Sequence, residues 1–83
     1  MTFKEFKELI ERNGEYRLSR EDENDEDTVR IYIWDNKEQL VYKMCIIKTW
    51  YVLFAHNPNS QFHVRYEEIC KRFITTPFEN KEL

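Results

Sequence analysis

Two cysteines and two histidines have the most specific chemistry in this sequence. Together they match the number and type of ligands that a tetrahedral zinc ion takes: Cys45, His56, His63 and Cys70. Their spacing opposes a zinc site, because the cysteines lie 25 positions apart, the histidines lie seven apart, and neither pair forms a CxxC or HxxxH motif. We therefore expect no cofactor and two free thiols on apolar faces, with a small zinc-binding protein as a minor alternative.

Glycine, thiol and carboxylate chemistry all argue against an enzyme. Gly14 is the only glycine, so the chain has no glycine-rich loop for a phosphate or dinucleotide and no nucleophile elbow. Neither cysteine forms a local nucleophile signature with a histidine, and thiols on apolar faces are usually inert. The acidic residues cluster in a polar segment, where nothing raises a pKa for acid or base catalysis. We expect a protein that is not an enzyme.

That polar segment, residues 21–27, is the most unusual local feature. Six of its seven residues are acidic: Glu21, Asp22, Glu23, Asp25, Glu26 and Asp27. Carboxylates on a hairpin loop can imitate a run of phosphates and occupy a basic groove. The competing interpretation is a solvated loop that keeps the protein soluble and prevents edge pairing. On the first interpretation, the partner is a protein with a basic surface.

The length and charge of the chain further restrict the class of protein. Eighty-three residues predict a single domain over 1–83, and 16 acids against 13 bases give a net charge of -3, which opposes direct binding to nucleic acid. Residues 1–38 hold twelve acids and seven bases, whereas residues 39–83 hold four acids and six bases, so one end is negative. The apolar runs are too short for a membrane span and the N-terminus lacks a signal-peptide pattern, so we expect no membrane contact and a cytoplasmic location.

Hydrophobic periodicity predicts the elements that position these residues. Thr2 and Glu5 have the spacing of a capping box, and a helix from there is expected to end at Asn13-Gly14. Four strands are predicted after this helix, at 15–20, 28–35, 39–47 and 50–55, and the last of them is expected to be central in the sheet. A second helix is predicted at 61–75. A short helical turn follows it, with Thr76 as its cap and with Pro77 and Glu79 in its first turn.

The predicted fold class is therefore α+β: an N-terminal helix, an antiparallel three- or four-stranded meander, and a C-terminal helix with a short terminal helical turn. Both faces of the predicted sheet hold apolar groups, including Tyr32 and Trp34 on one side of the second strand. Either the two helices divide between the faces, which we favour, or one face contacts another protein.

Residues 1–10 (MTFKEFKELI), 31–35 (IYIWD) and 66–79 (from YEEI to TPFE) resemble small accessory proteins encoded by phages and prophages of low-GC Gram-positive bacteria. Some small acidic members of that group are anti-CRISPR proteins, which bind an effector nuclease and block its DNA-binding surface with carboxylates. The resemblance implies an inhibitor that binds a CRISPR effector nuclease in the host bacterial cell and blocks its DNA-binding or activation surface. The six carboxylates would make the contact, and Tyr32 and Trp34 would anchor it.

The alternative hypothesis is a phage structural or regulatory protein that self-assembles through the sheet, as a homodimer for example, and has no nuclease target. In that case the acidic segment serves only solubility.

Overall fold

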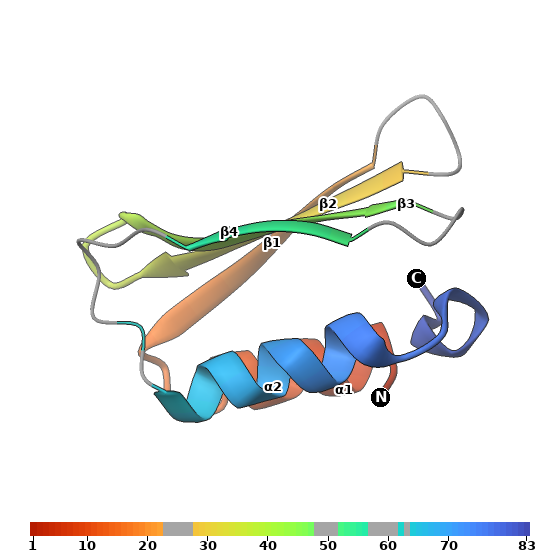
Figure 1. The fold of residues 1–83 in the computed structure, drawn as a ribbon. Coiled ribbons are helices and arrows are strands. Elements are labelled where there is room, and N and C mark those ends of the chain that lie inside the picture. Colours follow the sequence, from red (N-terminus) through yellow and green to blue (C-terminus); the bar gives the residue numbers. More distant parts are fainter. Residues whose placement is uncertain (23–27, 48–51, 57–61, 63) are drawn as a thin grey trace.

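The computed structural model describes residues 1–22, 28–47, 52–56, 62 and 64–83, with residues 52–56 and 64 described by their backbone alone. Its elements are, in order, α1 (Phe3–Glu11), β1 (Tyr16–Asp22), β2 (Thr28–Asp35), β3 (Leu40–Ile47), β4 (Val52–His56), α2 (Val64–Thr75) and the 3-10 helix η1 (Phe78–Lys81). The strands form one antiparallel sheet in the order β1-β2-β3-β4, and both helices lie on the same side of it (Figure 1). The predicted α+β meander is confirmed.

The first helix begins where the sequence predicts. Thr2 has an extended backbone, its hydroxyl accepts a hydrogen bond from the Glu5 amide at 3.2 Å, and the Glu5 carboxylate accepts one from the Thr2 amide at 3.1 Å. These bonds satisfy amide groups that have no partner inside the helix. Past the last turn, Gly14 takes a φ of 71°, a left-handed conformation that suits glycine, and its amide donates to the Glu11 carbonyl at 3.1 Å.

Residue alternation in the central strands decides which side chains meet the helices. In β2, Val29, Ile31 and Ile33 are all buried and form one row. Their partners across the β2–β3 ladder are Ile46, Met44 and Tyr42, which are also buried. Cross-strand partners share a sheet face, so these two rows form one continuous apolar layer beneath the helices.

A register shift in β3 interrupts this alternation. Ile33 pairs with Tyr42 but Trp34 pairs with Leu40, so Val41 is the extra residue of a β-bulge. Val41 and Tyr42 are consequently both buried, and Leu40 takes the position beside Trp34 on the other face. The sequence pattern predicts Leu40 on the same face as Tyr42, which is wrong, because strict alternation does not hold across a bulge.

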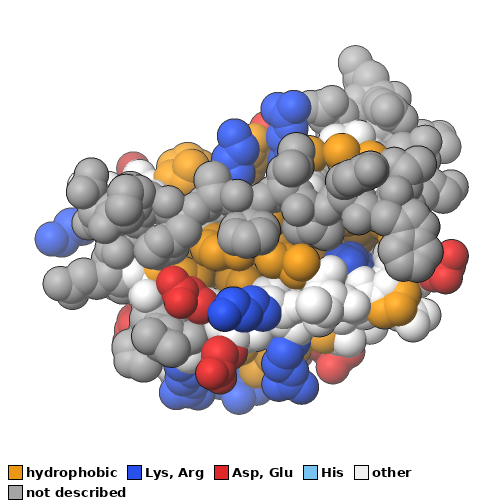
Figure 2. Space-filling model, in the orientation of Figure 1, with side chains coloured by type: hydrophobic (Ala, Val, Ile, Leu, Met, Phe, Trp, Pro, Cys, Tyr) orange, Lys and Arg blue, Asp and Glu red, His pale blue; other side chains and the backbone are white. Residues whose placement is uncertain are grey.

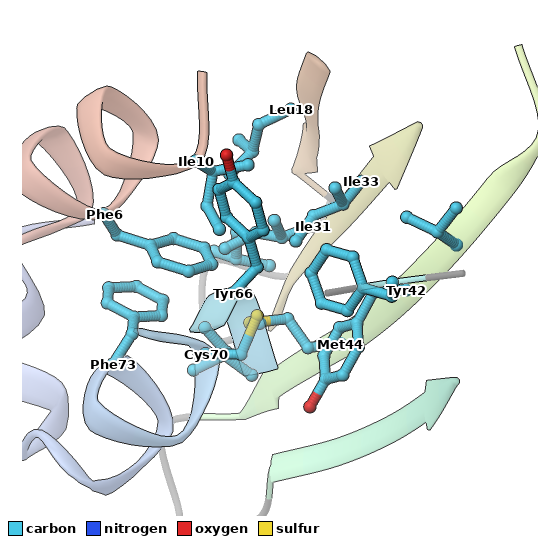
Figure 3. Close-up of a cluster of buried hydrophobic side chains, with 14 residues drawn as sticks. Phe6, Ile10, Leu18, Ile31, Ile33, Tyr42, Met44, Tyr66, Cys70 and Phe73 are labelled. Carbon is cyan, nitrogen blue, oxygen red and sulfur yellow. The ribbon is translucent and has the colours of Figure 1, made fainter. Parts of the chain in front are cut away.

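The hydrophobic core lies between the sheet and the two helices, and all the side chains labelled in Figure 3 belong to it. The rings of Phe6 from α1 and Phe73 from α2 stack with centroids 4.4 Å apart and planes 3° apart, and both are fully buried. This contact holds the two helices side by side. At the other end of α2, Phe62 and Tyr66 pack their rings against Tyr16 of β1.

Phe62 also shows why the second helix begins later than predicted. The spacing of apolar residues places its start near residue 61, but in the structure α2 begins at Val64. Phe62 is buried against Tyr42 as well as Tyr16 while lying before the helix. A buried aromatic residue one turn early has the same spacing as a helical position, so periodicity does not distinguish the two cases.

The C-terminal turn forms, but not with the predicted cap. The N-cap position of η1 is Pro77, without a side-chain hydrogen bond, and the Thr76 hydroxyl instead donates to the Arg72 carbonyl at 2.8 Å. The ammonium group of Lys81 is buried and donates to the carbonyls of Ile74 and Thr76. Burial lowers the pKa of Lys81. This lysine therefore covers carbonyl groups that α2 leaves without partners at its end.

Three further sequence predictions about the sheet are wrong. Strand β4 pairs with β3 alone and lies at an edge of the sheet, not at its centre, because each strand of a meander is added outside the previous one. Strand β1 continues to Asp22, since Glu21 and Asp22 pair with Arg30 and Val29. Finally, the two described α-helices do not divide between the faces, so one face has no described helix over it (Figure 1).

Candidate functional site

The side of the sheet away from the helices is the candidate site, and we call it the open face. The residues on it, given by the alternation and register of the first three strands, are Arg17, Ser19 and Glu21 of β1, Arg30, Tyr32 and Trp34 of β2, and Leu40, Lys43, Cys45 and Ile47 of β3. None of these residues is buried, whereas the helix-side residues between them in β2 and β3 are. The described helices leave this surface available to a partner.

Trp34 is held in a fixed position on the open face. Its indole Nε1 donates a hydrogen bond to the Ser19 hydroxyl at 2.9 Å, across the β1–β2 ladder. The Arg17 guanidinium lies over the indole ring, 5.6 Å from its centroid, and the Tyr32 ring lies 6.2 Å away at an interplanar angle of 35°. The indole thus has a satisfied polar group and an aromatic neighbour on a rigid strand.

The charge of the open face differs from that of the whole chain. Arg17 and Lys43 are exposed and Arg30 is half-buried, so three cations accompany a single carboxylate, Glu21. Glu21 is the register partner of Arg30. Figure 2 shows Lys and Arg side chains on the upper side of the molecule, where the sheet faces away from the helices. The described part of this face is positive although the chain carries a net charge of -3.

The acidic segment begins at the end of β1, but its first two carboxylates point to opposite faces. Glu21 alternates with Ser19 and lies on the open face, whereas Asp22 lies on the helix side. The Arg20 guanidinium Nε donates to the Asp22 carboxylate at 2.7 Å, and this ion pair compensates the charge of Asp22. Glu23, Asp25, Glu26 and Asp27 lie outside the described residues. Tyr32 and Trp34 share the open face with Glu21, so three of the predicted contact residues lie on one side of the sheet.

The outer edge of β1 is already occupied by a side chain. The Leu18 amide donates a hydrogen bond to the carboxylate of Glu11, near the end of α1, at 3.0 Å. Unpaired backbone amides on an edge strand can form hydrogen bonds with another strand. At this position Glu11 takes the place that such a strand would need.

The two cysteines lie on opposite sides of the sheet. Cys45 is half-buried on the open face, and Cys70 of α2 is fully buried in the core. Burial, together with the nearby Glu67 carboxylate, raises the pKa of the Cys70 thiol to about 12. His56 pairs with Tyr42 at the end of β4, and His63 is outside the described residues. The structure therefore does not bring Cys45 and Cys70 together as ligands of one zinc ion.

Metal and membrane sites were also considered in the residues that the structure describes. Nowhere among them do three His, Cys, Asp or Glu side chains form a group that could hold a metal ion. No helix among the same residues has the length and apolar character required to cross a membrane.

Sequence reasoning missed the polar residues around Trp34. Arg17, Ser19, Arg30 and Lys43 each look like an ordinary solvated strand position when taken singly. The available signal was their period of two, which places them on the same face as Tyr32 once the strands are in register. The register itself depends on the hairpins and the bulge, so the cluster becomes visible only in the folded sheet.

The fold and site define a small α+β protein with a four-stranded antiparallel meander, two helices on one face, and a basic, aromatic open face beside an acidic hairpin. No protein-family model, curated protein or solved structure matches the chain.

Proposed function

We propose that this protein acts by binding another protein, and that its partner is a CRISPR effector nuclease whose DNA-binding surface the acidic hairpin covers. The observation that carries the proposal is the place of the acidic segment, residues 21–27, in the chain. It connects β1 and β2, the two strands that carry Ser19, Tyr32 and Trp34 on the open face. A partner that contacts the acidic segment and extends along these two strands also meets the aromatic anchor.

Charge supports the same proposal. Residues 21–27 hold six acids, and one of them, Asp22, forms an ion pair with Arg20. A carboxylate row of this kind competes with DNA for a basic groove, because both draw on the same electrostatic attraction. The target class itself comes from the resemblance to accessory phage proteins.

Inhibition of DNA cleavage by a panel of CRISPR effector nucleases from low-GC Gram-positive bacteria tests the proposal. The test variant reverses the charge of three hairpin acids, Asp25→Lys, Glu26→Lys and Asp27→Lys. We expect it to inhibit at least about tenfold more weakly than the wild type, because attraction to the basic groove becomes repulsion. If it inhibits as strongly as the wild type, the hairpin is not the contact.

A matched control separates local charge from net charge. Glu8, Glu68 and Glu79 are exposed on or near the helices, so their replacement by lysine changes the net charge by the same amount at a distance from the hairpin. This control is expected to keep its inhibitory strength. An equal loss in both variants would mean that net charge alone, and not the hairpin, determines binding.

The uncovered face also supports the alternative of self-assembly. Trp34, Leu40 and Ile47 are apolar residues of that face and are not fully buried. Such surfaces on small proteins often form interfaces. Sedimentation equilibrium of the wild type and of Trp34→Lys tests this: a dimer that the substitution dissociates supports assembly, and a wild-type monomer rejects it.

A further inference from the structure

The open face offers two aromatic rings as a platform for stacking. Tyr32 and Trp34 lie two residues apart on one central strand, with centroids 6.2 Å apart. The bond from the indole Nε1 to Ser19 at 2.9 Å fixes one ring without covering it fully. Aromatic side chains on a sheet face are a common way of binding unpaired bases, since every base has a π-face that stacks regardless of sequence.

Cations surround this platform. Arg17 is placed over the Trp34 ring at 5.6 Å, Arg30 precedes Tyr32 by two residues on the same strand, and Lys43 is the register partner of Tyr32. Guanidinium groups bind phosphates and also stack on bases. With one carboxylate among three cations, this face attracts an anion even though the chain as a whole is acidic.

Two other occupants fit this surface less well. A two-fold symmetric dimer formed through the open face would bring two copies of a surface with three cations and one carboxylate together, and their net positive charges repel each other. A peptide strand that extends the sheet needs a free edge, and at β1 the Leu18 amide is already bonded to Glu11. An anionic strand that carries its own planar groups suits the surface better than either.

We propose that the open face binds single-stranded nucleic acid, with bases on Trp34 and Tyr32 and phosphates near Arg17, Arg30 and Lys43. Sequence specificity is not required, because stacking and phosphate contacts do not distinguish bases. The net charge of the chain does not describe this surface: six of the acids lie in residues 21–27, and the described residues of the open face carry three cations and one carboxylate. This inference does not require nuclease inhibition, although both proposals use Trp34 and Tyr32.

Fluorescence anisotropy with labelled oligo-dT and oligo-U tests the proposal on the full chain. The test variant is Arg17→Gln/Lys43→Gln, since both side chains are exposed and their loss leaves the core intact. The matched control is Lys4→Gln/Lys7→Gln, which removes the same charge from exposed positions of α1. We expect about tenfold weaker binding in the test variant, a slope of log affinity on log salt reduced by about 1 to 2, and a change of less than twofold in the control.

Stacking is tested separately with Trp34→Leu and Trp34→Phe, after circular dichroism has established that each is folded. We expect a loss of about tenfold with leucine and a smaller loss with phenylalanine, which retains a ring. The hairpin variant Asp25→Lys/Glu26→Lys/Asp27→Lys should bind the oligonucleotides at least as tightly as the wild type. The hairpin variant thus affects inhibition without weakening oligonucleotide binding, so each proposal can fail while the other holds.

Several results would overturn the proposal. One is a wild type that shows no binding to either oligonucleotide at low salt; another is an equal loss in the α1 control. Displacement of the oligonucleotide by a glutamate-rich peptide at lower concentration would identify an acidic protein segment as the true ligand. A dimer that dissociates in the Arg17→Gln/Lys43→Gln variant would identify a second copy.

Discussion

The two faces of the same sheet differ in what their residues do. In β2, Val29, Ile31 and Ile33 face the helices and are at most 5% exposed, whereas Arg30, Tyr32 and Trp34 alternate with them and stay partly exposed. One row contributes apolar burial, which is the main stabilising contribution to a small domain. The other row carries charge, a fixed indole and hydrogen-bonding groups. A single eight-residue strand thus contributes core residues on one side and, on the other, the surface that we propose for binding.

The two faces differ because the order of the elements along the chain leaves both helices on one side of the sheet. The meander places its four strands in sequence order, and α1 and α2 precede and follow it. The stacked rings of Phe6 and Phe73 hold the helices together, and neither helix is then left for the other face. Apolar residues on that second face consequently remain uncovered within the described structure.

The largest effect is expected from Phe73→Ala on the helix side. Phe73 is fully buried and stacks on Phe6, so its removal leaves a cavity between the helices. We expect the free energy of unfolding to fall by about 3–5 kcal/mol, a large share of the stability of a domain of this size. Urea unfolding followed by circular dichroism measures it. A loss below about 1 kcal/mol would mean that the contact between the helices contributes little.

The reaction rates of the two cysteine thiols allow the two faces of the sheet to be compared in the wild-type protein. With a thiol-specific reagent, Cys45 should react first, because it is half-exposed on the open face. Cys70 should react at least roughly 100-fold more slowly than Cys45, because the core must open before the reagent can reach this buried thiol. Cys45→Ser should abolish the fast phase and leave the slow one. Two fast thiols would contradict the described core.

The same buried thiol predicts a dependence on alkaline pH. Burial raises the pKa of Cys70 to about 12 from an ordinary value of 9.0. Above pH 9 the unfolded chain therefore loses a proton that the folded chain retains, which favours unfolding as the pH rises. Relative to Cys70→Ala, wild-type stability should fall between pH 9 and 11. Parallel curves for the two proteins would show that the thiol does not contribute.

A smaller effect is expected at the cap of α1. Thr2→Ala removes the hydroxyl that accepts from the Glu5 amide and should cost about 1 kcal/mol, whereas Thr2→Ser retains the bond. Backbone and side-chain hydrogen bonds from Thr2 lower the pKa of Glu5 below its ordinary value of 4.5. That contribution is present above the ordinary value and is lost as the pH falls through the lowered one. The difference between the variants, measured by urea unfolding, should thus diminish in acid.

The smallest effect on stability is expected on the open face. Tyr32→Ala removes a half-exposed ring, and we expect a cost under about 1 kcal/mol. The same variant should bind oligonucleotides more weakly if Tyr32 is part of the stacking platform. If Tyr32→Ala destabilises the protein as much as Phe73→Ala, the open face is a second core and the distinction between the faces fails.

Local patterns in the sequence predicted elements whose signals lie within a few residues. The capping box of Thr2 and Glu5 and the glycine after α1 specify both helix ends by hydrogen bonds within one turn. The alternation of Val29, Ile31 and Ile33 likewise predicts a strand from residues that are only a few positions apart. The pattern around Phe62 and Val41 gave wrong predictions. Phe62 is buried by ring contacts outside the helix, and Val41 is buried because of the β-bulge, and both features form only in the assembled sheet and helices.

The sequence by itself determined the helix and strand order, the first cap, the turn positions and the concentration of acids in residues 21–27. These depend on side-chain period and on local hydrogen bonds. The tertiary structure alone decided that β4 lies at an edge, that both helices cover one face, and that Arg17, Ser19 and Lys43 gather around Trp34 and Tyr32. Strand register and helix packing depend on partners distant in the chain, so no local window of residues contains them.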